Sequence, residues 1–196
     1  MTSRALILRA GFGLCLLALA VAPLVAQAPK ASAPVLITSC GQSPDAATMN
    51  IVLRMANVDH TMKEDATAKD LAGGKVKSIM IVTGTSGKGM GAAGVTIEEE
   101  LTRTKALLAE AKRLNIPVIG VHIGGKNRRG GAVAGDNSDE LSIDAVCLGA
   151  QFMIVRKEGD YDGRFTTISK TRKIPLLLFE KNNPELKDLL TTTFAK

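Results

Sequence analysis

Two glycine-rich segments hold most of the residues that could bind a ligand. Residues 84–94 and 120–135 contain eleven of the 19 glycines, and no acidic residue occurs in either segment. The same segments carry four cations: Lys88, Lys126, Arg128 and Arg129. Glycine lets a backbone approach a ligand closely and direct successive N–H groups at it, while Lys and Arg supply positive charge. This combination indicates a site for a small anion.

Neither segment matches a nucleotide-binding motif in full. Residues 84–88 lack the spacing of a P-loop, and Gly89 follows the lysine where Ser or Thr is required. Gly89, Gly91 and Gly94 have the spacing Gly-x-Gly-x-x-Gly, but no acidic residue ends a following strand to hold a ribose. We therefore expect no nucleotide and no other cofactor.

Cys40 and His122 are weak candidates for catalysis. Cys40 precedes an expected helix N-terminus, which lowers the pKa of a thiol, and His122 ends an expected strand. The alternatives are a packing or loop cysteine and a structural histidine. No Ser-His-Asp order or nucleophile elbow is present. With two histidines in the chain and no fixed spacing among Cys40, His122 and Glu158, we expect no metal site.

The elements that must position these residues alternate between apolar strands and amphipathic helices. The best-defined helix opens with a capping box, formed by Thr96 and Glu99. Apolar strands without alternation, each followed by a helix, predict a single doubly wound, mostly parallel α/β sheet of five or six strands, Rossmann-like or flavodoxin-like. Strands are expected at 35–38, 78–83, 116–122, 151–155 and 175–179, with a weaker segment near 59–62, and helices at 43–56, 66–71, 96–114, 138–148, 162–173 and 183–194.

In such sheets, ligands bind beyond the carboxyl ends of the strands, where the strand order reverses. Hydroxyl and amide side chains would orient the anion there, glycines would supply N–H donors, and cations would supply charge. A long solvated loop is the alternative interpretation. The candidate ligand-binding residues are Ser39, Gln42, Ser43, Ser86, Gly87, Lys88, Gly89, His122, Gly124, Gly125, Arg128 and Arg129. Cys40 and Cys147 are expected at opposite rims of the sheet, too far apart for a disulfide.

Residues 1–28 have the build of a secretory signal peptide. Arg4 and Arg9 precede an apolar run over 10–25, and cleavage is expected near Ala26 to Ala28. This leaves a flexible tether over 29–34 and a single domain over 35–196. The protein is therefore expected to be exported, periplasmic or extracellular, without stable membrane insertion after cleavage. An uncleaved anchor is the alternative.

Composition removes several classes of function. The chain is 45% hydrophobic and 22% charged, which excludes a disordered tail and a multi-span membrane protein. Aromatic residues make up 3%, and the formal net charge of +6 includes no dense basic stripe, so we expect no nucleic-acid partner. Export would also remove ATP and NAD as ordinary ligands, which counts against a kinase or a dehydrogenase.

Three strings, over residues 38–43, 87–94 and 122–130, resemble those of an uncharacterised family of exported bacterial proteins, classed as a domain of unknown function. The resemblance spans Val35 to Glu180 and implies a secreted Rossmann-like domain. Many members carry a small residue such as Ala at the position of Cys40, which implies that thiol chemistry is not the shared activity. The resemblance supplies no catalytic residue.

The sequence therefore predicts an exported domain that binds a small anionic metabolite, of carboxylate or phosphate type, without catalysis. A single lobe needs a loop, a membrane transporter or a second subunit to cover its ligand. One alternative is a hydrolase or transferase that acts on such an anion through Cys40 or His122. Another is a partner-docking module without a small ligand.

Overall fold

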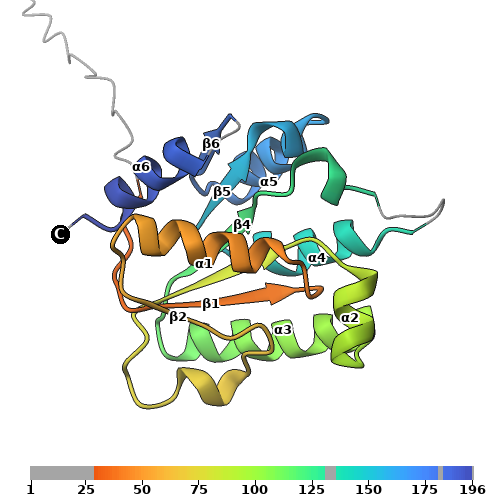
Figure 1. The fold of residues 1–196 in the computed structure, drawn as a ribbon, viewed down its shortest axis with the longest axis horizontal. Coiled ribbons are helices and arrows are strands. Elements are labelled where there is room, and N and C mark those ends of the chain that lie inside the picture. The colour runs from red at the N-terminus through yellow and green to blue at the C-terminus, as the bar shows by residue number, and fades with distance from the viewer. Residues whose placement is uncertain (1–28, 131–135, 181–182, 196) are drawn as a thin grey trace, which may run out of the picture.

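The computed structural model describes residues 29–130, 136–180 and 183–195 (Figure 1). The expected signal peptide, over residues 1–28, lies outside these ranges, as do residues 131–135 of the second glycine-rich segment. Within the described ranges, no helix is long and apolar enough to cross a membrane.

Six parallel strands form one sheet in the order β2-β1-β3-β4-β5-β6, which confirms the predicted doubly wound α/β fold. The order reverses between β1 and β3, which is the switch point of a flavodoxin-like sheet. The weak extended segment near residue 60 becomes an edge strand. The strands are β1 (Val35–Cys40), β2 (His60–Met62), β3 (Ser78–Thr83), β4 (Val118–His122), β5 (Phe152–Arg156) and β6 (Leu176–Phe179).

Helices cover both faces of the sheet (Figure 1). One face carries α1 (Asp45–Met55) and α6 (Asn183–Thr193), which pack on alternate residues of the strands, among them Val121 of β4. The opposite face carries α3 (Ile97–Arg113), α4 (Ser138–Cys147) and α5 (Arg164–Arg172). Successive strand side chains point to opposite faces, so the position of each strand-end residue decides which helices it meets.

The first glycine-rich segment differs from the open loop expected there. Gly87–Ala93 form a helix, α2, in which the Ser86 hydroxyl accepts a hydrogen bond from the Gly89 N–H at 3.1 Å. The helix ends at Gly94, which adopts a left-handed φ of 67°. A serine cap and a terminal glycine therefore outweigh the low helix propensity of the glycines between them. Three 3₁₀ turns complete the elements: η1 (Ala68–Leu71), η2 (Gly125–Arg128) and η3 (Lys157–Asp160).

The segment 29–34, expected as a flexible tether, is hydrogen-bonded to the domain. The Ala31 N–H donates to the Thr193 carbonyl at 3.0 Å, and the Ser32 N–H donates to Ser78 Oγ at 3.1 Å. The Pro34 carbonyl accepts from the Lys77 N–H at 2.9 Å. These bonds fix the entry of the chain into β1.

Candidate functional site

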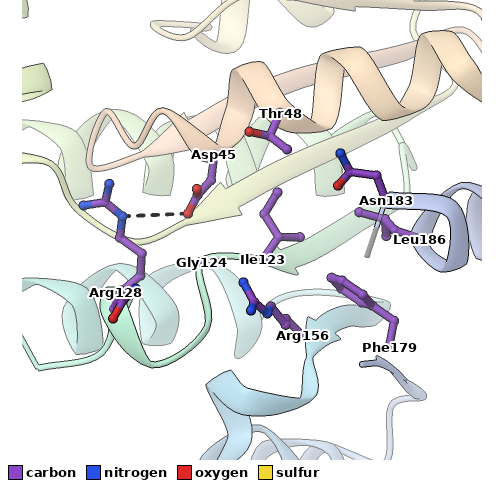
Figure 2. A pocket seen from close by; sticks show the side chains of 10 residues that line it. Asp45, Thr48, Ile123, Gly124, Arg128, Arg156, Phe179, Asn183 and Leu186 are labelled. Carbon is purple, nitrogen blue, oxygen red and sulfur yellow. Dashed lines mark ion pairs between the residues drawn. The ribbon is translucent and has the colours of Figure 1, made fainter. Parts of the chain in front are cut away.

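A cavity of about 510 Å³ opens at the carboxyl ends of β4, β5 and β6 (Figure 2). It lies on the face of the sheet that α1 and α6 cover. The first residues of these two helices, Asp45 and Asn183, form part of its wall. The η2 turn contributes Asn127 and Arg128 to its wall. The lining residues are Asp45, Thr48, Ile123, Gly124, Asn127, Arg128, Arg156, Phe179, Asn183 and Leu186.

Arg156 reaches the cavity through the alternation of β5. Phe152 and Ile154 pack in the core beneath α1 and α6, and Arg156 continues the same row as the last residue of the strand. Figure 2 shows its side chain among the other lining residues. This row of β5 side chains is therefore apolar in the core and ends in a cation at the cavity.

Two guanidinium groups and one carboxylate line the cavity, and a second carboxylate, that of Glu158, pairs with one of the guanidinium groups. Arg156 Nη2 lies 2.8 Å from the Glu158 carboxylate, and Arg128 Nη1 donates to the Thr85 carbonyl at 2.8 Å. Arg128 Nε stands 3.8 Å from Asp45 Oδ2, an ion pair without a hydrogen bond (Figure 2).

Two buried polar atoms of these lining residues lack a hydrogen-bond partner within the described part of the chain. They are Arg156 Nε, a donor, and Asp45 Oδ2, an acceptor. Buried polar atoms in native proteins are almost always paired. Both atoms are covered by the surrounding protein, so a ligand would contact these two side chains, 29% and 18% exposed, through their other atoms.

The N-terminus of α1 adds a positive field to the cavity but no spare N–H groups. The Asp45 N–H donates to Ser43 Oγ at 3.3 Å, and the Ala46 and Ala47 N–H groups donate to the carbonyls of Ser43 and Pro44. The helix dipole still favours negative charge near its first turn.

The switch point between β1 and β3, where we expected the ligand, is filled by the chain itself. Gln42 and Thr85 form an antiparallel bridge across it, and a Cβ added to Gly89 would overlap the Gln42 carbonyl. Ser43 and Ser86 serve as local partners of the first turns of α1 and α2, as described above. Gly87 and Lys88 are exposed on α2, away from the residues that line the cavity.

His122 points to the opposite face of the sheet from the cavity. Its Nδ1 lies 3.1 Å from Thr83 Oγ1, its Nε2 lies 3.2 Å from the Gly125 carbonyl, and its ring centroid is 5.0 Å from that of Phe165. Burial lowers the pKa of His122, so the ring is neutral near pH 7. These contacts match the structural alternative that the sequence left open.

Arg129 also turns away from the cavity, although Arg128 beside it lines the wall. Its Nε lies 2.7 Å from Glu140 and its Nη2 lies 2.7 Å from Asp162, while Nη1 donates to the Gly159 carbonyl. Its guanidinium also stands 5.2 Å from the ring centroid of Tyr161. The charge of Arg129 is compensated within the fold.

The remaining candidates of β1 are buried. Ser39 is fully covered, and Cys40 packs among the apolar residues beneath α3. Burial raises the pKa of the Cys40 thiol, which contradicts the lowered value expected from a helix N-terminus. Cys147, expected at the opposite rim, lies over the middle of β4, where a Cβ on Gly120 would be 3.2 Å from its sulfur. Both cysteines are free thiols.

Of the predicted residues, therefore, Gly124 and Arg128 line the cavity, and Gly125 forms the backbone behind it, close to Arg156 and Glu158. Sequence reasoning missed the other polar lining residues, which are Asp45, Thr48, Asn127, Arg156 and Asn183. The available signal was alternation: a cation placed two residues beyond the buried Ile154 continues that face of β5.

The chain matches a family model described as a domain of unknown function (DUF6305) over residues 32–194. No curated protein matches the sequence. Among solved structures, AlinE4, an SGNH-hydrolase family esterase, is similar at 14% identity and a TM-score of 0.28, covering 72% of this chain and 74% of that one. An archaeal fructose-1,6-bisphosphate aldolase is similar at 14% identity and a TM-score of 0.29, covering 83% and 80%. Likenesses at such TM-scores say nothing about the chemistry of this chain.

Proposed function

The chain belongs to the DUF6305 family of domains of unknown function, and from this premise we propose that it binds a small anionic ligand, of carboxylate or phosphate type, in the cavity beside Arg128 and Arg156. One observation carries the proposal: the Arg156 side chain is 29% exposed, and its guanidinium lies among the other residues that line the cavity (Figure 2). An anionic oxygen is the partner that such a guanidinium donor binds most strongly.

Size and charge support a small ligand. The volume of about 510 Å³ falls within the range of roughly 300 to 1,000 Å³ that is typical of small-molecule sites. Ile123, Phe179 and Leu186 give the cavity apolar walls for a carbon skeleton. The first turn of α1 adds a favourable field for negative charge. The carboxyl ends of the strands form a hollow, whereas a partner-docking module would present a flat surface there. This shape favours small-ligand binding over partner docking.

Binding is favoured over catalysis by the position of the reactive side chains. Cys40 is buried beneath α3, and His122 is held by Thr83 and the Gly125 carbonyl on the face opposite the cavity. Neither side chain is among those that line the cavity. A hydrolase or transferase that works through these two residues would need a different site.

We further propose that the protein is exported after cleavage near Ala26 to Ala28, and that a partner covers the open cavity. The composition of residues 1–28 supports export. A membrane transporter or a second subunit is the class of partner that would close a single-lobed site.

Thermal unfolding of residues 29–196, which contain the whole described fold, tests the proposed binding. The ligands are acetate, succinate, malate, inorganic phosphate, glycerol phosphate and sulfate. A ligand at about 100 times its Kd adds roughly 2.7 kcal/mol to the free energy of unfolding, which raises Tm by several degrees.

Arg156→Gln and Arg128→Gln are expected to remove the shift. The matched control is Arg172→Gln, which changes an exposed arginine that lines a separate cavity with Lys112 and Gln151. The proposal fails if no anion raises Tm, or if all three arginine variants behave alike.

A further inference from the structure

We infer that the ligand of this cavity is a hydroxylated anion, in which a neutral hydroxyl group stands a few bonds from the carboxylate or phosphate. The inference rests on the proposed function and deepens it by naming the class of ligand. It comes from the Asp45 carboxylate, which lines the cavity and accepts no hydrogen bond from any described residue.

Asp45 sets a requirement that a simple anion does not meet. Its side chain is 18% exposed and lines the cavity. Oδ2 is buried close to Gly124 and Arg128, so a ligand would reach the carboxylate through its other oxygen, Oδ1. An ionised carboxylate accepts hydrogen bonds and donates none, so a bound acetate or sulfate would face it with repulsion. Leaving a buried acceptor without a donor also weakens binding. The ligand must therefore bring a donor to Asp45 as well as an acceptor to Arg156.

The position of Arg128 selects a neutral donor over a charged one. Its Nε already stands 3.8 Å from Asp45 Oδ2, beyond hydrogen-bond distance but close enough to offset the carboxylate charge. An ammonium group placed on the same carboxylate would meet the guanidinium as a like charge. A hydroxyl group donates to the carboxylate without that repulsion.

The neighbouring side chains fit the same kind of molecule. Thr48, Asn127 and Asn183 bring short polar groups to the wall, and Phe179 adds an aromatic ring. Figure 2 shows Thr48, Asn183 and Phe179 among the lining residues. Hydroxy acids and phosphate esters of polyols combine a compact anionic group, a hydroxyl group and a short carbon chain. These are the features that this wall complements.

Three dicarboxylates that differ at one carbon atom test the inference. Malate carries a hydroxyl group there, succinate a hydrogen and aspartate an ammonium group. Isothermal titration of residues 29–196 should give a Kd for malate, as one of its enantiomers, about 10-fold to 100-fold lower than for succinate, because a hydrogen bond to a charged acceptor is gained. Aspartate should bind no more tightly than succinate.

If the anion panel selects phosphate instead of carboxylate, the matched pair is glycerol 3-phosphate and propyl phosphate, and the same difference is expected. Asp45→Ala should bring the two Kd values of a pair to within about twofold, by removing the acceptor. Asp45→Asn keeps the shape of the side chain at the start of α1. This substitution should also bring the two Kd values of a pair closer together. Arg156→Gln should weaken both members of a pair equally.

Two results would overturn the inference and leave the proposed function standing. In the first, both members of a pair bind equally well to the unmodified domain, and binding still depends on Arg156. In the second, aspartate binds more tightly than malate. If no anion in the panel binds, the proposed function fails, and the inference fails with it.

Discussion

Gly124 and Asp45 lie so close together that the cavity wall has no room for a side chain between them. A Cβ built on Gly124 would stand 2.5 Å from Asp45 Oδ2 and would overlap the aliphatic part of Arg128. Gly124 has a φ of −72° and a ψ of −8°, which any residue can adopt. Space, and not backbone conformation, therefore requires glycine at this position.

Gly124→Ala should lower the free energy of unfolding by about 1 to 3 kcal/mol, the usual cost of overpacking, and should weaken anion binding by displacing Arg128. Urea unfolding measures the first effect, and titration with the ligand identified above measures the second. Gly91→Ala is the matched control, because nothing lies within 4 Å of a Cβ in that exposed part of α2. It should be neutral or stabilising by up to about 1 kcal/mol. Equal effects of the two substitutions would contradict the packing argument.

Arg128 and Arg129 should separate binding from stability. Arg129→Met removes the buried cation that pairs with Glu140 and Asp162. We expect the free energy of unfolding to fall by about 2 to 3 kcal/mol, which is less than for a fully buried pair because both carboxylates are partly exposed. Arg128→Met loses one hydrogen bond, to the Thr85 carbonyl, and the 3.8 Å ion pair with Asp45, at a total cost of about 1 to 2 kcal/mol, but should abolish anion binding. Urea unfolding and ligand titration of both variants provide the comparison. The assignment is wrong if Arg129→Met is as stable as the parent domain.

Glu100 should make stability depend on pH. Burial alone raises its pKa, but hydrogen bonds from Arg103 and the Gly41 N–H, together with the Arg103 charge, lower the pKa by more. Because the folded pKa lies below the unfolded value of about 4.3, the stabilisation is present above that pH and is lost as pH falls through the folded pKa. Glu100→Gln should therefore cost about 3 kcal/mol or more at pH 7, and this difference should shrink below about pH 4.3.

Urea unfolding between pH 7 and pH 3 measures that difference. Glu110→Gln is the control, since Glu110 and Arg113 form the same i,i+3 pair on α3 at an exposed site. Its removal should change the free energy of unfolding much less than Glu100→Gln does, at every pH. A Glu100 effect as small as the Glu110 effect would show that the buried pair does not hold β1 to α3.

The thiols of residues 29–196 should be unreactive in the folded state. Burial raises the pKa of both Cys40 and Cys147, so neither carries appreciable thiolate at pH 8. The thiol reagent DTNB should label neither residue until guanidinium unfolds the domain, and both afterwards. Cys147→Ala isolates the signal of Cys40. Rapid labelling of folded Cys147→Ala would restore Cys40 as a candidate nucleophile.

Local patterns in the sequence determined the elements and their order. The apolar run over 78–83 predicts β3 with its observed bounds, and the capping box at Thr96 predicts the start of α3. Alternating strands and helices were enough for the doubly wound class, because each of these signals depends on residues within a few positions of one another.

Tertiary structure alone decided which cations line the cavity. Arg128 and Arg129 are adjacent in the sequence, yet one lines the cavity and the other is held by Glu140 and Asp162. Arg156 gains its place from the pleat of β5 and from the crossovers that bring α1 and α6 to the same edge. The cavity is lined by residues from five separate segments of the chain. No local sequence pattern predicts that these segments lie together, because their positions depend on how the helices pack over the sheet.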